Sequence, residues 1–304
     1  MNSRLNFPFA ERTRPLGLGG TDIGAILGLS PYKTPVDVYL SKVEPAEPYS
    51  ASPQAHWGSL MEPLLAQDYA IRHQVALDHP EQRSHAVHDW ALGNVDALVP
   101  KQAVVEFKTV WPNSPTEYQF GEEGTDRVPD SYLAQVLWYL AIFDLPRAHI
   151  VAMFMRSATV REYVIERQAP LESMLLERGR LFWENHIVMK QPPAPTKLTD
   201  VDRLFKRGDE GLSIEATPDL FELCAQLKVR RDELKRITKE SEDLEIQIKA
   251  EMGNAATLTW ESKPIVTWKN STSKVFDQKQ FAADYPGMAE KYKVPRETRR
   301  FLVK

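Results

Sequence analysis

The sequence predicts an α/β protein followed by a mainly helical C-terminal region. Two short strand patterns, at 93–99 and 103–109, stand close together in the chain. Helical patterns flank them at 56–65 and 130–140, and a much longer one covers 218–252. Strands enclosed between amphipathic helices are typical of a sheet covered by helices, so we expect a layered α/β core.

The two strand patterns bring charged side chains together. A turn at Pro100–Gln102 joins them as a hairpin, so Asp96 on the first strand can lie beside Glu106 on the second. Side chains alternate between the two faces of a strand. Glu106 and Lys108 therefore share one face, while Phe107 points to the opposite, apolar side.

This combination of residues suits a metal site. Two carboxylates and a backbone carbonyl offer the oxygen ligands that Mg²⁺ or Mn²⁺ prefers, with waters and a substrate phosphate completing the shell. Lys108 could orient an attacking water or stabilise negative charge in the transition state. The alternative is a surface hairpin that carries an ordinary Glu–Lys ion pair.

The flanking helices add two polar residues. Glu62, in the pattern at 56–65, could reach the same site, or it could be a surface acid that the helix dipole favours near the N-terminus. Pro129–Ser131 predicts the start of the second helix. Within that helix Gln135 is the polar exception and shares a face with Tyr139, which is equally consistent with a core position.

A glycine-rich segment precedes a helical pattern near the N-terminus. Gly19 and Gly20 permit close approach of the backbone before the run that begins at Thr21. A hydroxyl beside exposed N–H groups at a helix start can bind phosphate, although Thr21 or Asp22 could equally be an N-cap. For Asp22 we favour the N-cap. No Gly-Lys-Ser/Thr follows, so the segment is not a P-loop.

Four ordered blocks carry a resemblance to a known family. They are Gly19–Tyr32, Trp57–Glu62, Asp96 with Glu106 and Lys108, and Ala134–Tyr139. In this order and spacing they resemble the YqaJ-like viral recombinases and phage lambda-type exonucleases, which belong to the PD-(D/E)XK nuclease superfamily. The resemblance covers about half of the chain. It implies a restriction-endonuclease-like core, with a central mixed sheet flanked by helices.

The resemblance also implies roles for individual residues. The expected metal ligands are Asp96, Glu106 and the backbone carbonyl of Phe107, with Glu62 helping to hold a second metal. Lys108 resembles the catalytic lysine. Gln135 resembles a glutamine that lies near the nucleophile and the scissile phosphate.

Further residues resemble DNA contacts of the family. Arg14 and Thr21 resemble the arginine and hydroxyl residue that receive a terminal 5′-phosphate, and Asn94 resembles a small polar residue that a related enzyme class uses for the same phosphate. Trp57 and Tyr139 could contact DNA or serve only in packing.

The implied activity is 5′-to-3′ exonuclease digestion of double-stranded DNA ends, which leaves 3′ single-stranded tails for recombination by strand annealing. Two Mg²⁺ ions are expected in the active site, and Mn²⁺ could substitute. The implied partners are a phage single-strand annealing protein and further copies of the chain in a ring trimer. Alternatives are an endonuclease of the same superfamily, or a catalytically silent DNA-binding assembly module.

Composition limits the other classes. The chain has 304 residues with 42% hydrophobic content, as in globular proteins. A single cysteine, Cys224, excludes a disulfide framework and a four-cysteine iron–sulfur site within one chain. With neither an apolar signal segment at the start nor a long apolar run, we expect a cytoplasmic protein. The net charge of −4 is low for DNA binding, so basic groups such as the tail after Lys291 would have to act locally.

The chain is expected to divide into a nuclease core (1–190), a linker with three prolines (191–217) and an accessory region (218–304). The accessory region combines the long helix, a hairpin with its turn at Glu261–Lys263, and the basic tail. The leucines and isoleucines of the helix approach a heptad pattern, which Arg230 and Ser241 interrupt. A parallel homodimer is therefore not compelled, and packing on another helix of the chain or of a neighbouring subunit is equally consistent.

Overall fold

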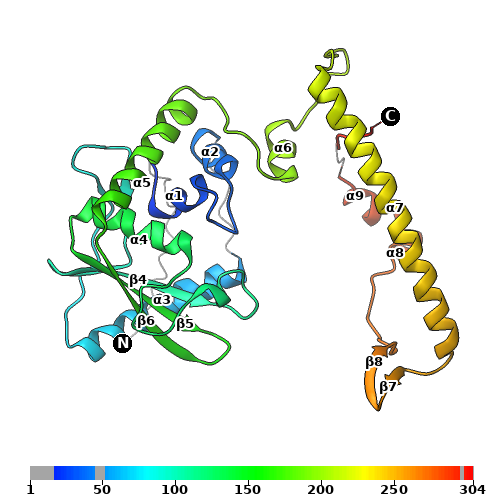
Figure 1. Cartoon of the computed structure of the whole chain (residues 1–304), viewed down its shortest axis with the longest axis horizontal. Helices are drawn as coiled ribbons and strands as arrows, with labels where there is room; N and C mark the ends of the chain where they lie inside the picture. Colours follow the sequence, from blue (N-terminus) through cyan, green and yellow to red (C-terminus); the bar gives the residue numbers. More distant parts are fainter. Residues whose placement is uncertain (1–16, 45–51, 295–297, 304) are drawn as a thin grey trace. The chain divides into compact units, whose positions relative to one another are not determined.

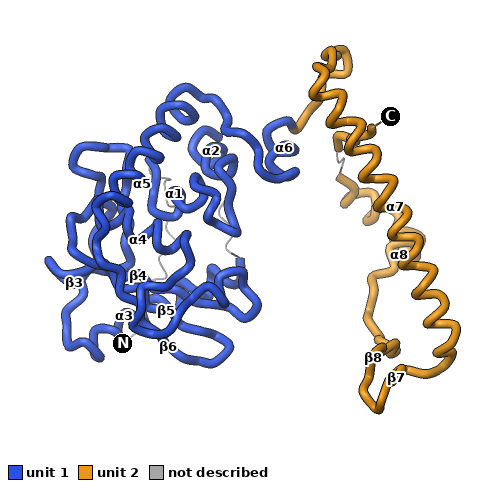
Figure 2. The backbone as a smooth tube through the Cα atoms, in the orientation of Figure 1, with its two compact units in different colours: residues 1–205 blue, residues 206–304 orange. Residues whose placement is uncertain are grey.

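A computed structural model describes residues 17–44, 52–294 and 298–303. The chain divides into two compact units, residues 1–205 and 206–304 (Figure 2). Unit 1 contains the main sheet and the helices around it, and unit 2 contains the longest helix (Figure 1).

Unit 1 is built on a four-stranded mixed sheet with the order β3–β4–β5–β6. Its strands are β3 (Ala97–Val99), β4 (Ala103–Val110), β5 (Arg147–Phe154) and β6 (Thr159–Glu166). β4 is parallel to β5, and both outer pairs are antiparallel. A second, two-stranded sheet joins β1 (Arg83–Ser84) to β2 (Leu92–Gly93).

The helices of unit 1 are α1 (Gly20–Ile26), α2 (Pro35–Val43), α3 (Pro53–His73), α4 (Asp130–Phe143), α5 (Ala169–Phe182), which continues as the π-helical segment η2 (Trp183–Val188), and α6 (Leu198–Leu204), together with the short 3-10 helix η1 (Glu117–Gln119). The hydroxyls of Thr34 and Ser52 cap α2 and α3, and a proline follows each cap at the first helical position. No helix within the described ranges is both long and apolar enough to cross a membrane.

The sheet has a buried cluster on each face. Val105 and Phe107 of β4 pack in a cluster with residues of α3. Val104 of β4 and Ile150 of β5 belong to the other cluster, with residues of α1, α4 and α5. Because faces alternate along β4, Glu106 lies on the same side as Val104, toward α4. The mixed sheet flanked by helices confirms the predicted core.

Residues 198–204 fall within the range expected to be a linker, yet they form α6. Asp200 is only 1% exposed. Its carboxylate accepts the hydroxyl of Thr34 at 2.8 Å and the N–H of Lys197 at 3.1 Å. The buried carboxylate of Asp200, with its several donors, ties α6 to the start of α2. The extended chain between the prolines and α6 is therefore short.

Unit 2 consists of α7 (Pro218–Met252), the hairpin β7 (Thr257–Trp260) and β8 (Lys263–Thr267), and the short helices α8 (Gln278–Asp284) and α9 (Pro286–Lys291). Glu261 and Ser262 both have positive φ, as a two-residue hairpin turn requires. The predicted long helix and hairpin are confirmed. Among the described residues of this unit, Met252 is the one buried apolar side chain.

A polar network joins α3 to the neighbouring strands β5 and β6 of the sheet. Glu162 on β6 is bound by His149 at 2.6 Å and by His73 at 2.8 Å, and His149 also bonds the hydroxyl of Tyr69 at 3.1 Å. Burial raises the pKa of Glu162, but the hydrogen bonds from the two histidines outweigh burial and lower that pKa to about 2. The ionised carboxylate therefore stabilises the fold.

We expect Glu162→Gln to lower the free energy of unfolding by about 1–2 kcal/mol near pH 6. A lowered pKa means that this contribution is complete above the ordinary glutamate pKa and is lost as the pH falls toward about 2. Urea unfolding of both proteins at pH 6 and pH 2.5 measures the difference. Glu166→Gln, an exposed site on the same strand, is the matched control. An equal gap at both pH values would show that the charge of Glu162 is not the cause.

Candidate active site

The β3–β4 hairpin sets the positions of three predicted site residues. Asp96 stands immediately before β3, so the predicted strand 93–99 is in fact interrupted between β2 and β3. The register pairs Ala97 with Val105, which brings Asp96 opposite Glu106. Lys108 follows two positions along β4, on the face of Glu106. The hairpin therefore brings the two carboxylates and the lysine together, as predicted.

Asp96 is anchored to the backbone of β4. Its Oδ2 accepts the N–H of Phe107 at 2.8 Å, at a point of β4 that β3 is too short to cover. The N–H and C=O of one strand residue point to the same edge of the strand. The carbonyl of Phe107 therefore lies on the edge where Asp96 stands, which is the position that a third metal ligand needs.

Glu106 is buried, with only 3% of its surface exposed. Its Oε1 accepts hydrogen bonds from the Nζ of Lys108 at 2.5 Å and from the Nε2 of Gln135 at 2.6 Å. Its Oε2 is buried as well and has no hydrogen-bond partner in the described part of the chain. A buried carboxylate oxygen without a partner is costly, and a cation would satisfy it.

Gln135 and Tyr139 reach the site from α4. They lie one turn apart, and the Nε2 of Gln135 also donates to the hydroxyl of Tyr139 at 3.2 Å. α1 packs closely here, since a Cβ added to Gly20 would come within 2.7 Å of the Tyr139 ring. Neighbouring Trp138 is fully buried and bonds the carbonyl of Leu92 at 3.0 Å. Trp138 thus belongs to the core, while Gln135 belongs to the site.

The electrostatics of the site favour an additional positive charge. Burial and the negative charge of Asp96 raise the pKa of Glu106 to about 8, although Lys108 opposes this, and Glu62 adds to the rise. Burial lowers the pKa of Lys108, but Glu106 and Asp96 outweigh burial and raise that pKa above its usual value. A divalent cation would keep a buried carboxylate such as that of Glu106 ionised.

The residues present fit an oxygen-ligated metal. No cluster of three or more His, Cys, Asp or Glu side chains of metal-binding geometry occurs among the residues that the structure describes. The set that does occur is two carboxylates, Asp96 and Glu106, with the carbonyl of Phe107. Mg²⁺ is commonly held by one or two carboxylates, with water and substrate phosphate in the remaining positions. The open Oε2 of Glu106 supports this fit.

Glu62 lies in the middle of α3 and is partly buried. It lines a cavity of about 500 Å³ with Ala66, Leu77 and His79. The Nδ1 of His79 lies 2.8 Å from the carbonyl of Asp96, so this cavity adjoins the site. Trp57, near the start of α3, is 52% exposed and makes an edge contact with the ring of His56. Trp57 therefore has no core role.

The structure describes two of the three residues predicted to bind a 5′-phosphate. Thr21 is exposed in the first turn of α1, and Asn94 is exposed between β2 and β3. Arg14 lies outside the described residues. The prediction that Asp22 is the N-cap is wrong: the N-cap of α1 is Gly19, and Asp22 stands at the third helical position, where its carboxylate accepts the N–H of Gly19 at 3.0 Å.

Two residues near the site were not predicted. Lys42, in the last turn of α2, forms a largely buried ion pair with Asp22 at 2.8 Å. His79 is bound to the carbonyl of Asp96. A lysine in the last turn of a helix, such as Lys42, carries no sequence signal of a distant partner. The sequence gives no signal for His79, because the histidines of the chain lack the spacing of a zinc site.

Comparisons with known proteins find similar sequences and similar solved structures. Residues 11–146 match the model of the YqaJ-like viral recombinase domain. The uncharacterized protein YqaJ of Bacillus subtilis (strain 168) is 28% identical over 306 residues, covering 96% of this chain and 92% of that protein.

Among solved structures, the exonuclease LHK-Exo in complex with dAMP aligns with a TM-score of 0.46 and 13% identity, over 57% of this chain and 89% of that one. A phage-related exonuclease from Haemophilus somnus 129PT aligns with a TM-score of 0.44 and 13% identity, over 58% and 97%.

Proposed function

We propose that this chain, which matches the YqaJ-like viral recombinase domain over residues 11–146, is a metal-dependent nuclease of that family that digests double-stranded DNA from its 5′ ends. The observation that carries the proposal is the buried Glu106 carboxylate. One of its oxygens is bound by Lys108 and Gln135, and the other is buried without a hydrogen-bond partner among the described residues, which a cation would supply. An ordinary surface ion pair would be solvated on both oxygens, so this geometry favours a catalytic site.

Asp96, Glu106 and the carbonyl of Phe107 would hold the metal, with Glu62 supporting a second ion. Bound Mg²⁺, or Mn²⁺ in its place, supplies an activated water and stabilises charge on the leaving 3′-oxygen. Lys108 places an ammonium beside the position of the attacking water, where it orients that water and stabilises charge on the phosphate. Gln135 holds the carboxylate of Glu106 in position through its amide N–H group.

The proposal that digestion starts at 5′ ends is based on the residues at the start of α1. A hydroxyl at a helix start beside backbone N–H groups suits a terminal phosphate, and Thr21 is exposed there. Arg14 would supply the charge, and Asn94 a further hydrogen bond. The products would be mononucleotides and a 3′ single-stranded tail. A single-strand annealing protein is the expected partner of that tail, and a ring of three copies would retain the DNA.

Digestion of three substrates tests the proposal. Linear duplex with 5′-phosphate, linear duplex with 5′-hydroxyl and closed circular duplex are each incubated with the protein and Mg²⁺. We expect rapid loss of the 5′-phosphorylated strand, slower loss of the 5′-hydroxyl strand, and an intact circle. A strand labelled at its 3′ end should persist longest, because digestion starts from the other end.

The same experiment separates the alternatives. Efficient cutting of the circle would replace the exonuclease with an endonuclease. Binding without any cleavage, with Mg²⁺ or Mn²⁺, would favour a silent DNA-binding module. Thr21→Ala provides the control for the end pocket: it should remove the preference for 5′-phosphate while the slower rate on 5′-hydroxyl ends remains unchanged.

A further inference from the structure

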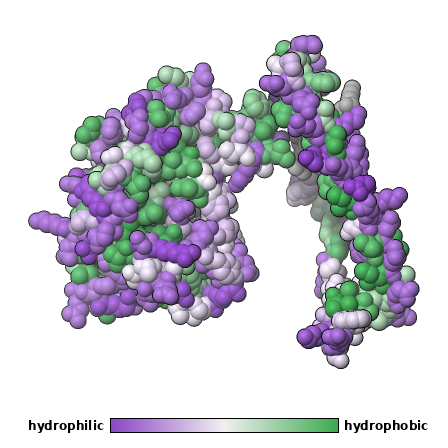
Figure 3. Space-filling model, in the orientation of Figure 1, coloured by the Kyte–Doolittle hydropathy of each residue, from purple (hydrophilic) through white to green (hydrophobic). Residues whose placement is uncertain are grey.

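The apolar residues of α7 are left largely uncovered by unit 2. Leu223, Leu234, Ile237 and Leu244 are each more than half exposed, at 59%, 64%, 54% and 61%. Apolar residues remain visible along this unit in Figure 3. A helix of 35 residues with such a row of exposed side chains needs a partner, since contiguous apolar surface of this kind is rare on isolated soluble proteins.

The exposed row follows a heptad pattern over five repeats. The first core position of each heptad is Leu220, Leu227, Leu234, Ser241 and Ile248, and the second is Leu223, Arg230, Ile237, Leu244 and Glu251. Apolar residues at these two positions form the seam of a coiled coil. The exceptions are Arg230, Ser241 and Glu251, and they decide which orientation of a helix pair is possible.

A parallel pair of α7 helices would place identical residues opposite each other. Arg230 would face Arg230 of the partner subunit, and Glu251 would face Glu251 of the partner subunit, in the interior of the seam. Like charges in contact within a desolvated interface are strongly unfavourable. The parallel orientation is therefore disfavoured by the sequence of the seam itself.

An antiparallel pair with twofold symmetry matches the exceptions to each other. In the register that overlaps the whole helix, Arg230 faces the partner's Ser241, and by symmetry Ser241 faces the partner's Arg230. The other layers pair Leu227 with the partner's Leu244, Leu234 with the partner's Ile237, and Ile248 with the partner's Leu223. At the ends, Leu220 faces the partner's Glu251, where solvent is close.

The charges beside the seam support the same register. Arg230 forms an ion pair with Glu233 of its own helix at 2.9 Å. In the antiparallel pair the partner's Glu240 lies next to the partner's Ser241, on the same flank of the seam as Glu233. The guanidinium of Arg230 then has the carboxylates of Glu233 and of the partner's Glu240 within reach. Arg230 is therefore ion-paired within the interface, and its positive charge separates these two acids, which would otherwise repel each other.

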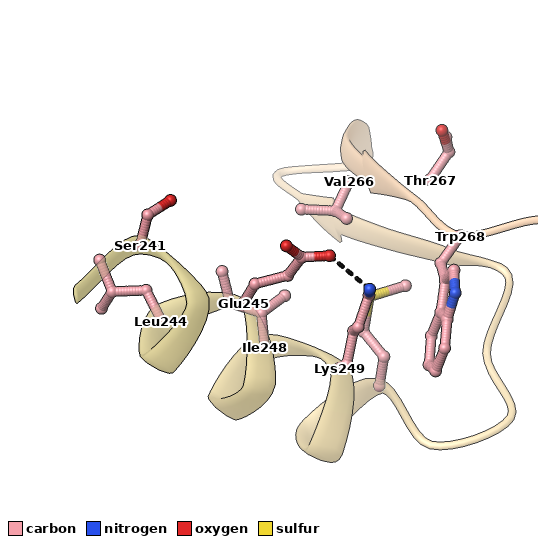
Figure 4. A pocket seen from close by; sticks show the side chains of 9 residues that line it. Ser241, Leu244, Glu245, Ile248, Lys249, Val266, Thr267 and Trp268 are labelled. Atoms are coloured by element: carbon pink, nitrogen blue, oxygen red, sulfur yellow. Dashed lines mark ion pairs between the residues drawn. The ribbon is translucent and has the colours of Figure 1, made fainter. Parts of the chain in front are cut away.

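The hairpin borders the seam near the C-terminal end of α7. Between α7 and β8 lies a groove of about 470 Å³, lined by Leu244 and Ile248 on the helix and by Val266 and Trp268 on the hairpin side (Figure 4). The antiparallel register brings the partner's Leu223 and Leu227 to this groove. Exposed leucines of one end of α7 thus meet an apolar groove at the other end.

We propose that α7 is a self-association surface, on which two copies of this chain pair antiparallel with Leu234 against the partner's Ile237 at the centre. The register places Cys224 beside the partner's Glu245, on the flank opposite to Arg230. Cys224 is exposed and is the single cysteine of the chain. A second cysteine at a chosen position therefore reports the orientation directly.

Cross-linking of the full chain with a short bismaleimide tests the proposal. Glu245→Cys should give a covalent pair of chains, about tenfold more of it than Asp219→Cys at the same protein concentration, because paired thiols have a high effective concentration. Asp219 is the matched control, since a parallel coiled coil would bring that position beside Cys224 instead. The unmodified chain, with Cys224 alone, measures random collision. Covalent pairs on a denaturing gel report this contact whatever other copies assemble through the rest of the chain.

Leu234→Asp in the Glu245→Cys chain should reduce cross-linking to the level of the unmodified chain, with helix content by circular dichroism unchanged. The proposal is wrong if Asp219→Cys cross-links as well as Glu245→Cys, or if Glu245→Cys gives no more pairs than the unmodified chain. Cross-linking that survives Leu234→Asp would also overturn it, because the seam would then not hold the pair.

Discussion

Replacing Lys108 with Ala is expected to lower the rate of DNA hydrolysis by roughly 10²–10⁴-fold, while DNA binding stays within a few-fold of the unmodified protein. The ammonium of Lys108 stands 2.5 Å from Glu106 Oε1 and 5.0 Å from the centre of the Tyr132 ring, with little exposure to solvent. In the proposed mechanism, a charge in that position acts on the reacting phosphate. It adds little to the grip on a long DNA duplex, which depends on many phosphate contacts.

The measurement combines initial cleavage rates in Mg²⁺ with binding by fluorescence anisotropy in Ca²⁺. Lys101→Asn is the matched control. It removes one lysine from the same hairpin, and asparagine tolerates the positive φ of 59° at that turn position. The control should retain full activity. If Lys108→Ala cleaves at the rate of the control, Lys108 has no part in the mechanism.

The local pattern of β4 was enough to predict which of its side chains face the site. Period-two alternation correctly put Glu106 and Lys108 on one face and Phe107 on the other, because the sheet has a different cluster on each face. The polar exception in the second helix, Gln135, indicated a residue that faces the site. These features depend on short stretches of chain, where periodicity determines the direction of a side chain.

Contacts between distant segments could not be predicted in the same way. That Lys108 and Gln135 share one oxygen of Glu106, while the other oxygen is left open, depends on how closely α4 packs on β4. The contact between Asp200 and Thr34 spans 166 residues, and no periodicity reports it. For the same reason α6 went unrecognised within a segment whose prolines suggested an extended linker.

Unit 2 would affect the proposed activity through the number of active sites that one assembly presents to DNA, because the net charge of the chain attracts DNA only weakly. A chain with a net charge of −4 gains little from nonspecific attraction to DNA. Pairing two chains through α7 would present two sites to one DNA molecule and raise the effective concentration of the second. If α7 pairs as proposed, Leu234→Asp should therefore weaken processive digestion more than it weakens the first cut.

Glu106→Gln is expected to abolish both metal binding and metal-dependent cleavage while the fold remains intact. Glutamine keeps the shape of the side chain and an oxygen that Lys108 can bond, but it presents no negative charge to a cation. Divalent cations need ionised oxygen ligands in such sites, so one of the two carboxylates cannot be replaced without losing affinity. Gln135 can still bond the new carbonyl oxygen, which should preserve the contact between α4 and β4.

Two readouts test the Glu106→Gln prediction independently of cleavage. Calorimetric titration with Mn²⁺ should give binding to the unmodified protein and none to the variant. Ca²⁺ at about 100 times its dissociation constant should stabilise the unmodified protein by about 2.7 kcal/mol, a rise of roughly 5–10 °C in Tm for a core of this size, and should leave the variant unchanged. Glu166→Gln, exposed on β6, should respond to Ca²⁺ like the unmodified protein. A variant that lost cleavage but kept the full response to Ca²⁺ would show that the metal is bound elsewhere and that Glu106 acts only on the position of Lys108.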